Sequence, residues 1–349
     1  MLAVPGLRPV ASEVSAMSPV LVAAAVALEL ASCLSFVVIF RMLFPQVPKQ
    51  AARELAWSQM GSGALLPGGG VGSLAVGGWL LHLAGIPTRE IVQRSSGLFF
   101  LTSALNVLAL GLASTLLLVG IGSGPHDVLR TGLPVVAVVS ATILTLGLPR
   151  FTRHVSRSHP RMAWLEDISI GIPAARTALA RPSWRLLGGF GYLLFDIAVL
   201  WTVFVAVGTT PPLAPLVVAY LVGYLANAVP IPGGVGVLDA GLVGALALYG
   251  LPVTHAVAAV LVYHAIAFWI PTLGGTLAYG RLRPHLTLAD GGVESEPPPP
   301  QLPAVNRPAA SSSLPRTLRP RARHDRGGQR ASTGAQGGLA SWGQRHTGA

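Results

Sequence analysis

Long apolar runs with few charges alternate with short polar segments along the first 283 residues. An α-helix rises 1.5 Å per residue, so about 20 apolar residues are enough to cross the hydrocarbon core of a bilayer. The pattern predicts an all-α polytopic membrane protein with about five full spans. We expect these spans at residues 19–44, 95–120, 133–148, 186–207 and 253–279.

Two further apolar stretches, at residues 57–85 and 213–250, are each broken in the middle by proline and glycine. Aligned without gaps, they match at the break, where a proline is followed by two glycines, and again at Pro87 and Pro252, twenty residues further on. Matches at a fixed separation define an internal repeat. The aligned tip residues are Pro67, Gly68 and Gly69 in the first stretch and Pro232, Gly233 and Gly234 in the second.

The placement of basic residues predicts how these two stretches sit in the membrane. The arginine-rich segment 150–185 and the basic C-terminal segment should both face the cytoplasm, because basic residues flanking apolar runs mark that face. Both basic segments face the cytoplasm if the first stretch enters and leaves the membrane from the cytoplasm and the second stretch enters and leaves it from outside. We therefore expect two re-entrant helical hairpins inserted from opposite faces, which form an inverted repeat of the kind found in transporters.

Composition supports a membrane location. Hydrophobic residues make up 52% of the 349 residues and charged residues 11%, with a mean hydropathy of +0.61. A soluble domain carries roughly 25% charged residues, so this composition excludes a soluble protein. Cys33 is the only cysteine, which excludes a disulfide within the chain and a CxxC metal site. We expect no cofactor.

Composition also divides the chain into three parts. Residues 1–18 form an N-terminal segment, and residues 19–283 form the transmembrane domain, which includes the basic cytoplasmic loop 150–185. Residues 284–349 are rich in Pro, Gly, Ser, Gln and Arg and contain few aliphatic side chains. Such a segment cannot bury enough apolar surface to fold, so we expect a disordered basic tail in the cytoplasm.

Asp239 lies just after the tip of the second hairpin, in an otherwise apolar half-helix. A carboxylate inside a membrane is costly and by default marks a functional site. The alternative is a structural hydrogen bond to the tip backbone or to Asn227. A bent tip also frees backbone groups that must be covered by protein or face a wet cavity, where a helix N-terminus favours a phosphate or a carboxylate.

Two more carboxylates, Glu29 and Asp196, lie within predicted spans. Each either pairs with Arg94 or His264 or relays protons. His264 either couples protons to transport near neutral pH or is a satisfied core residue. Arg94, at the cytoplasmic start of a span, either binds a lipid phosphate or marks the interface by snorkelling.

The run PIPGGVGVLDAGLVGALALYGLP, followed by AVLVYHAIAFWIPTLGG, resembles the signature of the lysylphosphatidylglycerol synthase transmembrane-region family. The resemblance covers about residues 19–283 and implies a helical fold with re-entrant helices that moves a lipid between leaflets. Asp239 stands where that family usually has Glu, and Tyr263 with His264 stands where it often has Tyr-Arg. No segment resembles the soluble domain that attaches lysine to phosphatidylglycerol, so we expect a stand-alone flippase-type module.

The sequence thus predicts a flippase or transporter of a lipid or lipid-linked headgroup in the bacterial plasma membrane. Its expected partners are a membrane phospholipid or polyprenyl-linked lipid, anionic headgroups at the cytoplasmic face and a second copy of the chain in a homo-oligomer, but no nucleic acid. An accessory or regulatory protein of envelope lipid metabolism is an alternative. A lipid-modifying enzyme is a weaker one, because the sequence contains no HExxH or DxD motif and no paired histidines.

Overall fold

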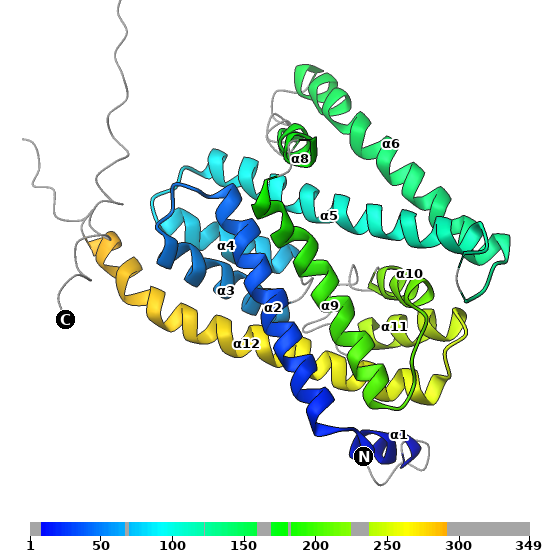
Figure 1. Ribbon diagram of the computed structural model, residues 1–349. Helices are drawn as coiled ribbons and strands as arrows, with labels where there is room; N and C mark the ends of the chain where they lie inside the picture. The colour runs from blue at the N-terminus through cyan, green and yellow to red at the C-terminus, as the bar shows by residue number, and fades with distance from the viewer. Residues whose placement is uncertain are drawn as a thin grey trace, which may run out of the picture.

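The computed structural model describes residues 8–66, 70–121, 123–158, 169–180, 183–224 and 237–291 (Figure 1). All regular structure in this part of the chain is helical, and five helices are long and apolar enough to cross a membrane. The prediction of an all-α polytopic protein with five spans is confirmed. The five long helices are α2 (Pro19–Leu43), α5 (Thr88–Leu118), α6 (Val128–Ser158), α9 (Leu187–Ala206) and α12 (Val253–Gly291).

The remaining helices are short. Two of them, α3 and α4, cover the first interrupted stretch, and α10 and α11 cover the second. Their bounds, with those of the terminal and connecting helices, are α1 (Arg8–Ala16), α3 (Lys49–Leu65), α4 (Gly70–Leu83), α8 (Gly171–Ala180), the 3-10 helix η3 (Trp184–Leu186), α10 (Leu213–Tyr224) and α11 (Val237–Leu248).

Three of the long helices extend beyond the spans expected from the sequence. Helix α5 begins at Thr88, seven residues before its expected start. Helix α6 continues through Pro149 to Ser158, and α12 continues through Pro284 to Gly291. A proline inside a helix removes one backbone hydrogen bond but does not always end the helix. The first residues of the predicted basic loop therefore prolong α6, and residues 284–291 of the predicted tail prolong α12. Helix α8, within the same predicted loop, packs against α5.

Helices α2 and α9 lie side by side through the middle of the molecule, and α12 crosses them (Figure 1). Glycines of α9 allow the close approach to α2. A Cβ atom at Gly188 would lie 2.7 Å from the carbonyl oxygen of Ser35, and one at Gly191 would lie 2.7 Å from the Ser35 hydroxyl. This contact joins the first turns of α9 to the second half of α2.

The two interrupted stretches form helical hairpins, and the helices of each hairpin pack against each other. Gln46, which precedes α3, donates a hydrogen bond to Glu90 at the start of α5, so the chain enters and leaves the first hairpin at one end of the bundle. Thr209, which precedes α10, bonds His255 at the start of α12, so the same is true of the second hairpin. We call these the first-hairpin end and the second-hairpin end.

The two ends lie on opposite sides of the bundle. Ser183, just before α9, contacts Met42 of α2 at the first-hairpin end. Helix α9 then runs for 20 residues, about 30 Å, to the second-hairpin end. The hairpins are therefore inserted from opposite ends, as the inverted repeat requires.

Helices α4 and α11, the second helices of the two hairpins, end in the same capping motif. Gly85 and Gly250 have φ angles of 83° and 92°, in the left-handed region that suits glycine. In both copies the glycine N–H donates to the carbonyl three residues earlier, and the next N–H donates to the carbonyl five residues earlier, as in a Schellman motif. The carbonyls of Pro87 and Pro252 then accept the first bonds of α5 and α12.

The repeat extends well beyond the hairpins that revealed it in the sequence. Corresponding residues are 165 positions apart, as are Pro87 and Pro252, and at this spacing helices α2 to α5 correspond in order to α9 to α12. The packing repeats as well, since α12 packs against α3 and α5 packs against α10. Each unit consists of a span, a hairpin and a second span.

Glycines also bring α12 against the first hairpin. The Cα of Gly61 in α3 lies 2.7 Å from where a Cβ at Gly275 would stand, and the carbonyl of Trp57 lies equally close to it. The neighbouring Gly274 accommodates the indole of Trp57. Two helices can approach this closely only where neither carries a side chain.

We predict that Gly275→Ala lowers the thermal stability of the detergent-solubilised protein, by about 1–3 kcal/mol, because the added methyl overlaps backbone atoms. Gly280→Ala, on the same helix, is the matched control, since a Cβ there meets open space. Thermal unfolding of both variants checks this. Equal unfolding temperatures would show that α3 and α12 do not pack as described.

We also predict opposite accessibility for Thr88 and Val253, exposed residues at corresponding positions just after the two capping turns. In a Cys33→Ser background, a membrane-impermeant maleimide should label Thr88→Cys only from the cytoplasmic face and Val253→Cys only from the other face. Labelling of both from one face would contradict the inverted arrangement.

Candidate functional site

A cluster of tyrosines and carboxyl groups lies where α2, α9, α10 and α12 meet. Asp196 of α9 accepts a hydrogen bond at one carboxyl oxygen from Tyr220 of α10, and at the other, at 3.0 Å, from Tyr263 of α12. Both tyrosines are buried, and their rings pack edge to face with centroids 6.3 Å apart. Two phenol donors are what a buried carboxylate needs in place of water.

Glu29 of α2 lies near Asp196 in the same cluster, because one turn away Ser32 of α2 donates a hydrogen bond to the carbonyl of Tyr192 in α9. It is 5% exposed. Its Oε1 atom accepts from the Cys33 thiol, one turn along the helix, at 3.7 Å, whereas its Oε2 atom has no hydrogen-bond partner among the described residues. We call Glu29, Cys33, Asp196, Tyr220 and Tyr263 the tyrosine–carboxyl cluster.

Asp239 and His264 form a second polar contact. Asp239 lies in the first turn of α11, and its Oδ1 atom is 2.8 Å from Nδ1 of His264 on α12. Both side chains are mostly buried, and the imidazole stacks on Phe268. His264, one of the two pairing partners predicted for Asp196 and Glu29, therefore pairs with Asp239 instead. Since His264 follows Tyr263 directly, one turn of α12 serves both this pair and the cluster.

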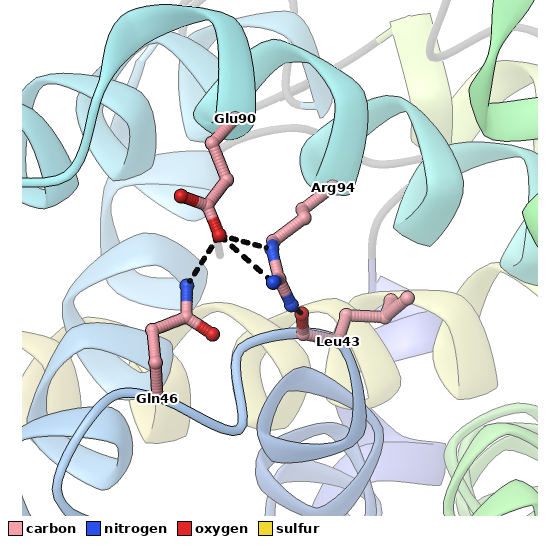
Figure 2. Close-up of polar contacts among 4 residues, drawn as sticks. All are labelled: Leu43, Gln46, Glu90 and Arg94. Carbon is pink, nitrogen blue, oxygen red and sulfur yellow. Dashed lines mark hydrogen bonds and ion pairs between the residues drawn. The ribbon is translucent and has the colours of Figure 1, made fainter. Parts of the chain in front are cut away.

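Arg94 lies at the first-hairpin end, in a different network (Figure 2). Its Nε and Nη2 atoms are both 2.8 Å from Oε1 of Glu90, and Nη1 donates to the carbonyl of Leu43. Leu43 is the last residue of α2, and the final carbonyls of a helix lack intrahelical donors. Arg94 therefore caps α2 and ties it to α5. A role in binding lipid phosphate stays a prediction.

The tips of both hairpins lie outside the described residues. Seven of the predicted site residues fall there, and the structure describes only the flanking helices, which resume at Gly70 and Val237. The seven are Pro67, Gly68, Gly69, Asn227, Pro232, Gly233 and Gly234.

A basic pocket of about 190 Å³ opens at the first-hairpin end, between the end of α2 and the starts of α3 and η3. Arg41, Lys49 and Arg185 line it, and none of them forms an ion pair with a described residue. The Arg185 guanidinium lies 5.7 Å from the ring centroid of Trp184, which is largely exposed. An exposed tryptophan beside basic side chains is typical of a membrane interface.

Sequence reasoning missed two parts of this arrangement. Tyr220 and Arg185 were not among the predicted site residues, because each joins its group from a helix remote in the chain. The aromatic residues of α10, Tyr220 and Tyr224, are spaced one turn apart, but this spacing alone does not distinguish a core tyrosine from a carboxylate ligand. Among the described residues, no group of three or more His, Cys, Asp or Glu side chains is arranged to hold a metal ion.

The fold and these sites define a polytopic α-helical membrane protein built on an inverted repeat. The chain belongs to the lysylphosphatidylglycerol synthase transmembrane-region family, whose model matches residues 1–275. This confirms the resemblance seen in the sequence.

A segment of 95 residues is 37% identical to a protein of Methanothermobacter thermautotrophicus described as a UPF0104 membrane protein. The similar segment covers 26% of this chain and 27% of that relative, so the match spans about a quarter of the relative's length. No solved structure matches the chain.

We predict that Arg94→Gln lowers the thermal stability in lipid-free detergent by about 1–3 kcal/mol, because it leaves the Leu43 carbonyl without its donor and Glu90 without its cationic partner. Arg153→Gln, which removes an exposed arginine, should have little effect. Unchanged stability of Arg94→Gln, together with weaker lipid binding, would contradict the capping role and favour the phosphate role.

Proposed function

We propose that this protein moves a lipid, or the headgroup of a lipid-linked molecule, between the leaflets of the bacterial plasma membrane. The observation that carries the proposal is the inverted repeat, with two hairpins inserted from opposite ends and a polar cluster buried beside the second. Inverted repeats with interrupted helices support alternating access, in which one unit moves against the other around a central site. The family to which the chain belongs is consistent with lipid handling.

The buried ionisable groups support this proposal because an ionisable group inside a membrane by default marks a functional site. Asp196, Asp239 and His264 lie on helices that a lipid surrounds, where each ionisable group is costly. They gather on the second hairpin and on the spans beside it. A headgroup passing between the hairpins would meet hydrogen-bonding groups there, while its acyl chains remain in the bilayer.

The basic pocket supports the choice of an anionic headgroup. Three cations without an acidic partner among the described residues converge at one helix junction, and such pockets bind phosphate-bearing headgroups by charge. The start of α3 adds backbone N–H groups, since its N-cap residue makes no side-chain hydrogen bond. We place this end at the cytoplasmic face, together with the C-terminal tail, because of its arginines.

The test is lipid translocation by the purified protein in vesicles, followed by chemical quenching of a fluorescent headgroup in the outer leaflet. Phosphatidylglycerol should move faster than in empty vesicles and faster than phosphatidylcholine. A triple variant, Arg41→Gln, Lys49→Gln and Arg185→Gln, should move phosphatidylglycerol about 100-fold more slowly, because each cation near the surface contributes about 1 kcal/mol.

The matched control removes three exposed arginines near the same end without touching the pocket, as Arg150→Gln, Arg153→Gln and Arg176→Gln. It should retain translocation. Equal losses in both triple variants would mean that overall charge, not the pocket, matters. If vesicles with the intact protein moved neither phospholipid nor a polyprenyl phosphate faster than empty ones, the transport proposal would be wrong.

A further inference from the structure

The tyrosine–carboxyl cluster holds two carboxyl groups and no facing cation among the described residues. The side chains that meet there are Glu29 and Cys33 from α2, Tyr192 and Asp196 from α9, Tyr220 and Tyr224 from α10, and Tyr263 from α12. All of these are acidic or neutral. The nearest basic residue along α12, His264, directs its Nδ1 atom to Asp239.

On the two helices that carry the carboxyl groups, the next basic side chains in the described part of the chain lie well away from the cluster. Arg41 is twelve residues from Glu29 on α2, which is about 18 Å. Arg185 is eleven residues from Asp196, about 16 Å. The segments 67–69 and 225–236, which complete the hairpins, contain no Lys, Arg or His in their sequence.

Two negative charges cannot share this site. The effective penalty for burying one ion is several kcal/mol even after relaxation, and a second like charge nearby adds to it. Interacting carboxyl groups of this kind retain a proton between them. At least one of the two must therefore be neutral.

The hydrogen bonds indicate which one. Asp196 accepts a phenol at each carboxyl oxygen, so its negative charge is compensated. Glu29 has only a thiol, a weak donor, at Oε1, and Oε2 has no partner in the described part of the structure. Glu29 is also the more enclosed, at 5% exposure. Because Oε2 of Glu29 has no partner among the described residues and lies near the Asp196 anion, a proton bound to Glu29 removes the second negative charge.

We propose that Glu29 and Asp196 form a proton-binding site in which Glu29 holds the proton and Asp196 is the anion held by Tyr220 and Tyr263. The step is a simple protonation, in which the Glu29 carboxylate takes up one H⁺ and becomes a carboxylic acid. Tyr224, which is 39% exposed, stacks on Tyr220 with centroids 5.8 Å apart, so an exposed side chain lies directly beside the site. In transport, loss and uptake of this proton couple a pH gradient to headgroup movement, a role that rests on the proposed function.

Infrared spectroscopy of the intact protein in lipid nanodiscs tests proton occupancy without any transport assay. At neutral pH the wild type should show the C=O band of a protonated carboxylic acid, and Glu29→Gln should lose it. Asp196→Asn should keep the band. Glu54→Gln is the matched control, because Glu54 is equally buried but accepts from Gln50, and it too should keep the band.

Glutamine has the shape and the neutrality of protonated glutamate, so Glu29→Gln should unfold at the same temperature as the wild type or higher. Absence of the band in the wild type, or its persistence in Glu29→Gln, would overturn the assignment. Loss of the wild-type band on exchanging K⁺ for Na⁺ would also overturn it, since a sodium ion would then be the neutralising ligand.

Coupling is tested separately in vesicles with a pH gradient. Phosphatidylglycerol translocation should accelerate with the gradient in the wild type and become independent of it in Glu29→Gln. If translocation by the wild type were independent of the gradient while its infrared band was intact, the proton site would not drive transport. That result would overturn the coupling. A normal band in a protein that moves no lipid would overturn the proposed function while the proton site stands.

Discussion

The fold depends on one constraint, which is that every backbone N–H and C=O group inside the membrane needs a hydrogen-bond partner. A helix interrupted inside a membrane exposes N–H and C=O groups that lipid cannot bond, so the interruption must be enclosed by protein. In the described helices that flank the interruptions, glycines allow close helix crossings. Helix α12 packs on α3 at Gly61 and Gly275, and in the second hairpin Gly223 of α10 lies against the backbone of Leu242 in α11. The pairing of α3 with α12 has its counterpart in the pairing of α10 with α5, so each hairpin packs against the second span of the other half.

The two halves share a backbone plan but differ in chemistry. At a separation of 165 residues, Asp196 corresponds to Ala31, Asp239 to Leu74, Tyr263 to Leu98 and His264 to Phe99. The acidic groups that pair with tyrosine or histidine, Asp196 and Asp239, therefore belong to the second half, whereas the first half contributes the buried carboxyl groups of Glu29 and Glu54. Because α2 and α9 are corresponding helices packed together, Glu29 reaches Asp196 across the pseudo-symmetry axis. The repeat thus gives both halves the same arrangement of helices, and the polar side chains that differ between the halves form the site.

The spans, the hairpins and their opposite insertion were predictable because they leave local marks. Apolar length, Pro-Gly interruptions and arginine-rich flanks are properties of short segments, and the capping glycines Gly85 and Gly250 recur at matched positions. The correspondence of α2 with α9 was not visible, since apolar residues replace one another freely on lipid-facing helices and few identities remain. The partners of Asp196 were not predictable either. Tyr220 and Tyr263 reach it from helices 24 and 67 residues away in the chain, and only the helix crossings decide which polar groups meet.

The central claim is that each hairpin returns to the end of the bundle at which it begins. Pulsed electron spin resonance distances in nanodiscs test it most directly, with paired spin labels in a Cys33→Ser background. Labels at Lys49 and His82, and separately at Leu213 and Leu248, should lie well under the thickness of the hydrocarbon core, about 30 Å. A control pair at Val20 and Lys49, on either side of α2, should lie at about that thickness or beyond. Distances for the hairpin pairs as long as the control would show that these segments cross the membrane, and the account would fail.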